Sequence, residues 1–306
     1  MTSLHFSNNT FVPGDLSFDD WMRGVLSSFE AALQHYLPSS DVVPQRLHEA
    51  MRYTVLGGGK RVRPLLVAAA GELVGGEQTA ILAAGCAIEL IHCYSLVHDD
   101  MPCMDDDALR RGRPTVHVQY DEATALLVGD ALQTRAFEIL ADDTLPHGLR
   151  SVATLAKASG SRGMAGGQAI DLGSVGIKID RTTLEIMHRM KTGALLKAAV
   201  ELGLLSAQQI AVEQYLQLAE FGQIIGLAFQ VVDDILDATA STEALGKTAG
   251  KDEANDKPTY VSILGLQAAQ ALAKSLHENA LTLLAPYGEN AGRLRQLADL
   301  IIARSH

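Results

Sequence analysis

The chain has 306 residues, 47% of them hydrophobic, which is enough for one large domain or two small ones with a sizeable core. Its formal net charge of −11 argues against a general nucleic-acid binder, so no nucleic-acid partner is expected. The three cysteines lack CxxC spacing and the N-terminus lacks a secretory pattern, so we expect a cytoplasmic protein. No apolar run reaches the roughly 18 residues of a membrane span, so no span is expected.

The composition predicts an all-α protein, because Ala, Leu, Gln and Glu dominate and the alternation typical of strands is scarce. Residues 1–18 lack periodicity and are expected to form a loose arm. No Pro- or Ser-rich linker divides the remainder, so residues 19–306 are expected to form a single domain. The expected helices are 19–37, 44–57, 61–74, 78–99, 120–140, 147–160, 181–203, 207–238, 257–285 and 289–304.

Helices 78–99 and 207–238 are apolar on most faces, which is typical of the centre of a large bundle. Each ends in a cluster of aspartates, and acids at a helix C-terminus oppose the helix dipole. Two such charges 4 Å apart repel by roughly 4 kcal/mol at an effective dielectric of about 20. A solvated helix end is the ordinary explanation of one acidic run, but two runs after core helices favour cation binding. The aspartates are Asp99, Asp100, Asp105, Asp106 and Asp107 in the first motif and Asp233, Asp234 and Asp237 in the second.

Aspartate oxygens without His or Cys partners suit Mg²⁺, which completes its shell with water and substrate phosphate. In the second motif the spacing puts the three aspartates on one helix face. In the first motif, Pro102 must end or bend the helix, and the break can turn Asp105 back toward Asp99. The two motifs therefore predict a diphosphate held between two metal-binding clusters.

Basic residues are concentrated in short motifs. The segment Gly57–Pro64 resembles a P-loop but fails the pattern at Thr54 and Arg61. It is better interpreted as a turn before a helix whose first residues, with Lys60 and Arg63, can bind an anion, although a solvated basic turn is equally compatible. Arg110, Arg111 and Arg113 could neutralise the neighbouring aspartates or bind phosphate through their forked guanidinium groups. Taken alone, Lys191 and Lys247 would be surface lysines and His92 a core residue.

These motifs together resemble the trans-prenyl diphosphate synthases, over roughly residues 25–305. Within that family the segment Tyr94–Pro102 is most similar to bacterial farnesyl diphosphate synthases. Ala108 and Val261 depart from the family pattern, at positions outside the expected metal ligands. The motifs, in family order, are Gly58–Pro64, Asp99–Asp105, Leu109–Gly112, Lys191–Gly193 and Phe229–Asp237.

The resemblance implies an isoprenoid-synthase-type helical bundle with a central cavity, a homodimer, and three Mg²⁺ ions per site. The implied reaction joins isopentenyl diphosphate to dimethylallyl and then geranyl diphosphate, giving (E,E)-farnesyl diphosphate. The departing diphosphate would take the final proton, so no side-chain base is required. The implied metal ligands are Asp99, Asp100, Asp105, Asp233 and Asp237, and the implied catalytic residues are Asp99, Asp105, Asp233, Lys191, Thr192 and Gln230.

The resemblance also assigns binding roles. Gln168 and Asp171 would line the pocket, Gly246–Gly250 would form a lid, and Tyr94 with Ser95 would form the floor that limits product length. The allylic diphosphate would be bound by Arg110, Lys191, Thr192, Gln230, Lys247 and Lys257, and isopentenyl diphosphate by Lys60, Arg63, His92 and Arg111.

Three alternatives remain open from the sequence. A geranylgeranyl diphosphate synthase would have the same site with a deeper pocket. A terpene cyclase would not need Lys60, Arg63 and Arg111, and a non-catalytic subunit of a heteromeric synthase should have lost aspartates from one motif, whereas both motifs are intact.

Overall fold

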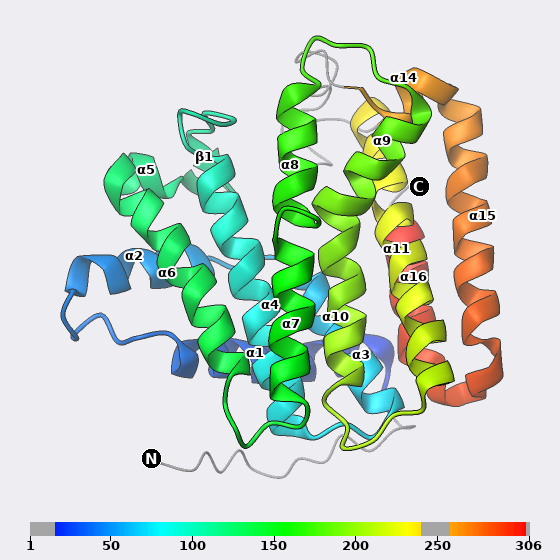
Figure 1. The fold of residues 1–306 in the computed structure, drawn as a ribbon, viewed down its shortest axis with the longest axis horizontal. Coiled ribbons are helices and arrows are strands. Elements are labelled where there is room, and N and C mark those ends of the chain that lie inside the picture. Colours follow the sequence, from blue (N-terminus) through cyan, green and yellow to red (C-terminus); the bar gives the residue numbers. More distant parts are fainter. Residues whose placement is uncertain (1–15, 240–257, 304–306) are drawn as a thin grey trace.

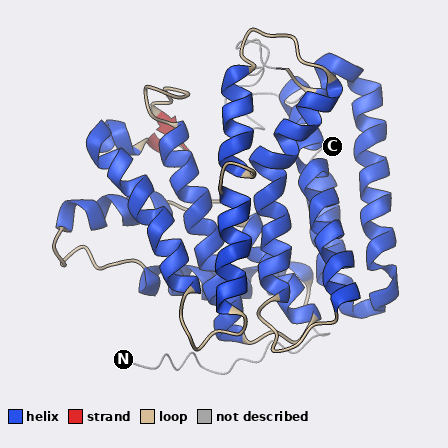
Figure 2. Ribbon diagram, viewed as in Figure 1, coloured by secondary structure: helices blue, strands red, loops and turns tan. Residues whose placement is uncertain are grey.

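The computed structural model describes residues 16–239 and 258–303, and this part of the chain is a bundle of helices (Figures 1 and 2). The prediction of an all-α protein is confirmed. The first eight helices are α1 (Phe18–Tyr36), α2 (Gln45–Val55), α3 (Val62–Leu73), α4 (Gln78–Asp99), α5 (Val116–Gln119), α6 (Glu122–Leu140), α7 (Gly148–Ser159) and α8 (Met164–Gly173).

The second half of the bundle carries a short π-helical turn, η1, and a 3₁₀ segment, η2. Its elements are α9 (Arg181–His188), η1 (Arg189–Gly193), α10 (Ala194–Leu204), α11 (Val212–Thr239), α14 (Tyr260–Leu264), α15 (Leu266–Leu284), η2 (Ala285–Ala291) and α16 (Gly292–Ala303).

Several helices begin where a side chain caps the first backbone amides. The Asp121 carboxylate accepts a hydrogen bond from Thr124 N at 2.7 Å at the start of α6, and Asp180 does the same for Thr183 N at 2.8 Å in α9. Thr259 and Ser262 form a reciprocal capping box at the start of α14. These caps fix where the helices that surround the site begin.

Helix α4 is the centre of the larger hydrophobic cluster. Its residues from Ala80 to Leu90 are all buried, which confirms the expectation of a core helix. A smaller cluster lies between α9, α11, α14 and α15, and Ile224 and Ile302 pack against both clusters. The C-terminal ends of α4 and α11 lie at the same end of the bundle, the upper end in Figure 1, so both acidic motifs reach that end.

Helices α4 and α11 are long and apolar enough to cross a membrane by length and mean hydropathy, although neither is an uninterrupted apolar run. In the structure, 83% of the most apolar window of α4 and 56% of that of α11 are buried inside the bundle. Core helices pass the same test, so the two helices are weak evidence for a membrane span.

The structure differs from the expected helices in several places, including the short helix α5 and the segment η2, which were not expected. Residues 164–173 form the unexpected helix α8, and the expected helix 181–203 is interrupted by η1. The expected helix 257–285 is divided at Gly265, whose φ of 81° suits glycine and ends α14. A two-stranded antiparallel hairpin, β1 (Leu109–Arg110) and β2 (Arg113–Pro114), was also not expected.

Candidate active site

The first acidic motif folds back on itself after α4 ends at Asp99. Asp105 N donates to Asp99 O at 2.9 Å, and Asp107 N donates to Asp100 O at 3.2 Å. Asp106 takes a left-handed backbone conformation (φ 50°) that closes this turn. The chain after Pro102 thus returns Asp105 to the end of α4, as the sequence analysis expected.

Asp99 lies among groups from three other elements. Gln168 Nε2 of α8 donates to Asp99 Oδ1 at 2.9 Å. Burial raises the pKa of Asp99 to about 6, a shift opposed by the positive charge of Lys191 and reinforced by Asp105. Lys191 itself donates to Asp171 Oδ2 at 2.5 Å. The structure therefore brings together Asp99, Asp105, Gln168, Asp171 and Lys191 from α4, the acidic loop, α8 and η1.

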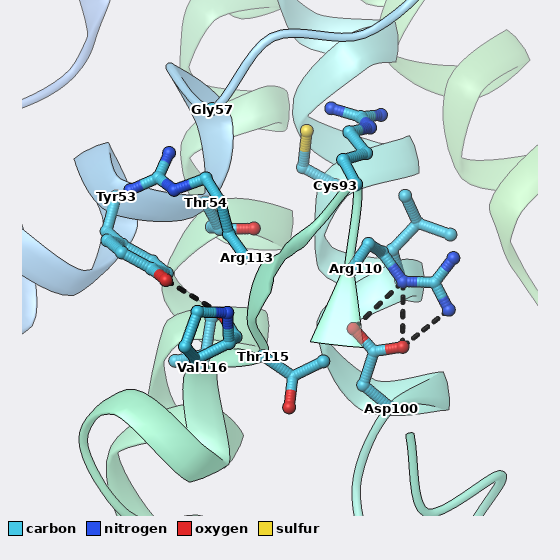
Figure 3. A pocket seen from close by; sticks show the side chains of 12 residues that line it. Tyr53, Thr54, Gly57, Cys93, Asp100, Arg110, Arg113, Thr115 and Val116 are labelled. Atoms are coloured by element: carbon cyan, nitrogen blue, oxygen red, sulfur yellow. Dashed lines mark hydrogen bonds and ion pairs between the residues drawn. The ribbon is translucent and has the colours of Figure 1, made fainter. Parts of the chain in front are cut away.

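Asp100 is buried and is bound by Arg110. The Arg110 Nε and Nη2 atoms donate to Asp100 Oδ1 at 2.8 and 2.5 Å, and Nε also donates to Oδ2 at 3.0 Å (Figure 3). Asp107 lies 3.5 Å from the same guanidinium group. In this structure Arg110 neutralises the neighbouring aspartates, which is one of the two roles that the sequence left open for it.

The hairpin that carries these arginines is anchored to the last turn of α2 and to the loop that follows it. Tyr53 OH donates to Pro114 O at 2.8 Å, and the Arg113 guanidinium lies 4.1 Å from the centre of the Tyr53 ring (Figure 3). Arg111 Nη1 donates to Gly58 O. The hairpin thereby holds Arg111 beside the basic segment that precedes α3.

The second acidic motif divides into separate environments. Asp234 is buried, and its carboxylate accepts hydrogen bonds from Gln230 Nε2 at 3.1 Å and from Tyr260 N at 2.7 Å. Gln230 Oε1 in turn accepts from Thr192 Oγ1 at 3.0 Å. Asp233 is half-buried and Asp237 lies one turn further along the helix. A hydrogen-bonded chain therefore links α11 to η1, beside Lys191.

Close backbone packing places η1 between α8 and α11. A Cβ atom on Gly167 would collide with the backbone of Lys191, and one on Gly226 would lie 2.7 Å from Gly193 Cα. Gly166 and Gly167, a pair that favours a break in an isolated sequence, lie inside α8. These glycines let Lys191 and Thr192 reach both neighbouring helices.

A separate basic cavity of about 470 Å³ lies where the loop before α3 meets α4 and α10. The four residues expected to bind isopentenyl diphosphate, Lys60, Arg63, His92 and Arg111, all line this one cavity. Arg63 is half-buried, and its buried Nε atom has no hydrogen-bond partner within the described residues. Burial lowers the pKa of Arg63, and Arg111 adds to this shift while Glu89 opposes it. The cavity offers positive charge to an anionic ligand.

His92 is neutral in this setting, because burial lowers its pKa well below the ordinary value and Arg63, Arg111, Arg110 and Arg61 lower it further. Arg61 lines the same cavity, but its charge is used within the fold. It donates to Glu89 at 2.8 Å, to Glu30 at 2.9 Å and to Val55 O at 2.6 Å. Arg63 and Arg111, which line the same cavity, therefore contribute positive charge that Arg61 does not offer to a ligand.

The donor set of the acidic end suits a hard cation. Within the described residues no three His, Cys, Asp or Glu side chains gather closely enough to hold a metal ion by themselves. Mg²⁺ bound by one or two carboxylates takes its remaining ligands from water and phosphate, so this arrangement fits Mg²⁺ only together with a phosphorylated substrate. The raised pKa of half-buried Asp99 fits the same conclusion, since a cation there would stabilise its charged form.

Tyr94 and Ser95 lie on α4, one turn and more before Asp99. Tyr94 is buried, and its ring meets His98 edge-on with the ring centres 5.8 Å apart. Ser95 Oγ donates to His92 O at 2.9 Å. Lys247, Lys257 and the expected lid Gly246–Gly250 lie outside the described residues.

Two contributions to this site carry no signal in the sequence. Asp234 looked equivalent to its neighbours, and only its contact with Tyr260, 26 residues away, gives it a different role. His188 is buried, stacks on Tyr260 with the ring centres 5.5 Å apart, and has Nε2 at 3.8 Å from Asp234 Oδ2. No short motif marks His188, so only the tertiary structure reveals it.

An all-helical bundle with two aspartate motifs at one end and a separate basic cavity defines an enzyme class that acts on diphosphates. The chain belongs to the polyprenyl synthetase family, whose model matches residues 44–298. It is 48% identical over 289 residues to a probable farnesyl diphosphate synthase of Bradyrhizobium diazoefficiens, an alignment that covers 93% of this chain and 87% of that protein.

Other relatives carry two product names. The farnesyl diphosphate synthase of Escherichia coli is 43% identical over 95% of this chain and 100% of its own. The chloroplastic geranylgeranyl pyrophosphate synthase of Capsicum annuum is 48% identical over 86% of this chain and 73% of its own. A geranyltransferase of Helicobacter pylori, solved with magnesium and isoprenyl diphosphate, superimposes with a TM-score of 0.83 at 34% identity and covers 95% of this chain and all of its own.

Proposed function

We propose that this protein is a farnesyl diphosphate synthase, which joins isopentenyl diphosphate to dimethylallyl and then to geranyl diphosphate. The observation that carries the proposal is the presence of two charged sites with different chemistry in one bundle. One has carboxylates with Lys191, Thr192 and Gln230, and the other is the basic cavity with Lys60, Arg63, His92 and Arg111. Condensing two diphosphates requires two such sites.

The carboxylate site receives the allylic substrate, whose diphosphate must leave. Mg²⁺ ions, three per site, would be held by Asp99, Asp100, Asp105, Asp233 and Asp237 and would stabilise the leaving diphosphate as Lewis acids. The magnesium-bound relative from Helicobacter pylori supports the choice of this ion. Arg110, Lys191, Lys247 and Lys257 add positive charge to the same diphosphate.

In the proposed reaction, the oxygen dipoles of Thr192 and Gln230 stabilise the allylic cation. The Thr192 hydroxyl donates to Gln230 Oε1, which directs the lone pairs of Thr192 Oγ1 away from Gln230. Because Gln230 Nε2 is held by Asp234, the orientation of its amide is set before substrate binds. Preorganised dipoles of this kind favour developing positive charge without reorganisation.

The basic cavity holds isopentenyl diphosphate, which keeps its diphosphate throughout. The uncompensated Arg63 Nε atom and the neutral His92 both suit this ligand, the first as a charged donor and the second as a neutral one. The departed diphosphate takes the proton that completes the reaction, so no side-chain base is needed.

A geranylgeranyl diphosphate synthase is the second candidate, since the Capsicum annuum relative has the same identity, 48%, as the Bradyrhizobium one, over a somewhat shorter alignment. The buried Tyr94 favours the shorter product, because a bulky ring below Asp99, with Ser95 beside it, limits the room for the growing chain. The proposal also includes a single domain over residues 19–306, a homodimer, a cytoplasmic location and no nucleic-acid partner.

The test is an assay with purified protein, Mg²⁺, dimethylallyl and isopentenyl diphosphates, with product lengths separated by chromatography. We expect C15 product, loss of activity with EDTA, and recovery with Mg²⁺. Asp99→Ala and Asp233→Ala should each lower kcat by at least a hundredfold, because stabilisation of the leaving group is lost. The exposed Asp143→Ala serves as the control and should leave kcat unchanged. Near-normal turnover in either aspartate variant would refute the role of the acidic motifs.

A further inference from the structure

A second basic cavity lies outside both sites described above. It has a volume of about 440 Å³ and opens between α7, α10 and α11. Five basic side chains line it and only one acidic side chain does, although the whole chain has a net charge of −11. Its basic residues are Arg150, Lys157, Arg162, Arg189 and Lys197, and its acidic residue is Glu201.

The charges of this cavity are only partly balanced. Glu185 binds Arg189 at 2.7 Å, and Lys197 lies 3.7 Å from Glu201. Lys157 and Arg162 make no ion pair or hydrogen bond within the part of the chain that the structure describes. Two uncompensated cations at the rim of a cavity attract a ligand that carries at least two negative charges.

The rest of the lining suits an organic group. Ala153, Ala158 and Ala194 give the cavity small apolar walls, and the Tyr215 ring carries the Arg150 guanidinium 4.3 Å from its centre. A cavity of this size holds a small molecule, and apolar walls with a few charged groups are typical of such sites. The combination matches a diphosphate joined to a small organic body.

The cavity shares a wall with the catalytic site. Arg189 and Gly193 of η1 line the cavity. Between them in the sequence, Lys191 contacts Asp171 and Thr192 contacts Gln230 in the catalytic site. Since η1 is packed tightly against Gly167 and Gly226, a ligand that presses on Arg189 and Gly193 must shift the turn as a unit. Such a shift would move Lys191 and Thr192.

We propose that the cavity between α7, α10 and α11 is a regulatory site that binds a small diphosphate and lowers turnover by displacing η1. The binding step stands on the cavity alone, whereas the regulatory step rests on the function proposed above. Inorganic diphosphate, an allylic diphosphate and a nucleotide share the required chemistry, and they are distinguished by the experiment.

Binding is tested by calorimetric titration of inorganic diphosphate, geranyl diphosphate and ATP into the whole protein in EDTA. For at least one probe, we expect two bound ligands per chain, one in the cavity of Arg63 and one here. Lys157→Glu/Arg162→Glu should lose one of them, with at least about 100-fold weaker binding, since two charge-assisted contacts are reversed. Lys274→Glu on the exposed face of α15 is the control and should bind as the native protein does.

The probe that loses its second site in the double variant identifies the ligand. If inorganic diphosphate binds tightly, the natural ligand is the diphosphate that the reaction releases. If only geranyl diphosphate binds, the site also requires a prenyl group against the alanine wall. If only ATP binds, the natural ligand is a nucleotide. If no probe binds here, or if the double variant keeps the native stoichiometry, the site does not exist.

Regulation is tested in the Mg²⁺-dependent assay with the identified probe. The native enzyme should show a noncompetitive component of inhibition that the double variant lacks, while their uninhibited kcat values agree within about twofold. Loss of binding without loss of that component would overturn the regulatory role. A native protein without prenyl transfer would refute the proposed function instead, and the titration would still decide the binding site.

Discussion

At the scale of single residues, Asp234 has the most specific role that the structure reveals. One of its oxygens accepts a hydrogen bond from Gln230 Nε2 and the other accepts one from Tyr260 N. Asp234 therefore orients the side-chain amide of Gln230 and also anchors the start of α14. Both donors are N–H groups, and a carboxylate satisfies both of them because each of its two oxygens is an acceptor.

Asp234→Asn should impair both functions, because the new amide nitrogen must face one of the two donors. We expect the free energy of unfolding to fall by about 1–3 kcal/mol, the cost of leaving a buried donor unsatisfied. Turnover should fall while KM for both substrates changes little, since Gln230 loses its fixed orientation. Urea unfolding and steady-state kinetics measure these effects. The exposed Asp299→Asn, which loses only a contact with His277, should change neither. An Asp234→Asn enzyme with native kcat would show that Gln230 is oriented by other groups.

His188 gives the protein a specific pH dependence. Burial lowers the pKa of His188 to about 4, helped by Lys191 and opposed by Asp171. The unfolded chain binds the proton near the ordinary value of about 6.5, so the unfolded state gains protons first as the pH falls. Stability is therefore unaffected by His188 above about pH 6.5 and decreases from there to about pH 4.

His188→Phe keeps the stacked ring on Tyr260 and removes the titration. Between pH 7 and pH 5, the native protein should lose about 2 kcal/mol more unfolding free energy than the variant, measured by urea denaturation at both pH values. Parallel pH profiles for the two proteins would mean that His188 is protonated in the fold at pH 5.

The aspartates and most basic residues of the site could be predicted because their spacing is short and their chemistry is unusual in a core helix. Asp99 and Asp105 needed only the effect of Pro102 on a helix. The roles of Asp234 and His188 could not be predicted, since both depend on Tyr260, whose position is set by tertiary packing.

At the scale of elements, Arg61 ties three helices together at the entrance of the basic cavity. It occupies the left-handed position before α3 and contacts Glu30 of α1, Val55 O of α2 and Glu89 of α4. Arg61 and Glu89 are both buried. Burial alone would lower the pKa of Arg61, but the charge of Glu89 raises it, so the Arg61 guanidinium remains charged.

Glu89→Ala should destabilise the protein by about 3 kcal/mol, because it leaves a buried guanidinium group without its main counter-charge. Glu138→Ala is the matched control, since it removes the partially exposed partner of Arg135 and should cost less than about 1 kcal/mol. Both values follow from urea unfolding at pH 7. Equal costs for the two variants would mean that Glu30 alone can compensate Arg61.

The helices themselves were largely predictable from periodicity, and the errors have physical causes. Gly166 and Gly167 favour a break in an isolated sequence, but close packing against η1 makes glycine necessary inside α8. The interruption by η1 has no signal in composition, because its residues continue a helical pattern. Both errors fall where the site requires helices to approach closely.

At the scale of the whole molecule, the bundle separates two tasks along the length of α4. In the proposed function, its C-terminal end presents Asp99 to the diphosphate, and its preceding turns contribute to the buried interior into which a growing chain would extend. Product length then depends on which side chain first blocks that path. Tyr94 precedes Asp99 by five residues, about 7.5 Å along the helix.

Replacement of Tyr94 by Ala should therefore shift the product from C15 to C20 and longer, because it removes a buried ring below the metal site. The first condensation, from C5 to C10, should keep its rate, since its short product does not reach that depth. Product lengths are measured by chromatography after incubation with excess isopentenyl diphosphate.

Ser95→Ala is the control on the next position of the same helix and should leave the product at C15, because a serine is too small to block the path alone. Circular dichroism must show that the Tyr94 variant remains folded, since loss of a large buried side chain costs about 3–5 kcal/mol. A folded variant that still stops at C15 would mean that Tyr94, held edge-on against His98, only supports the packing between α4 and α6, and that another residue forms the floor.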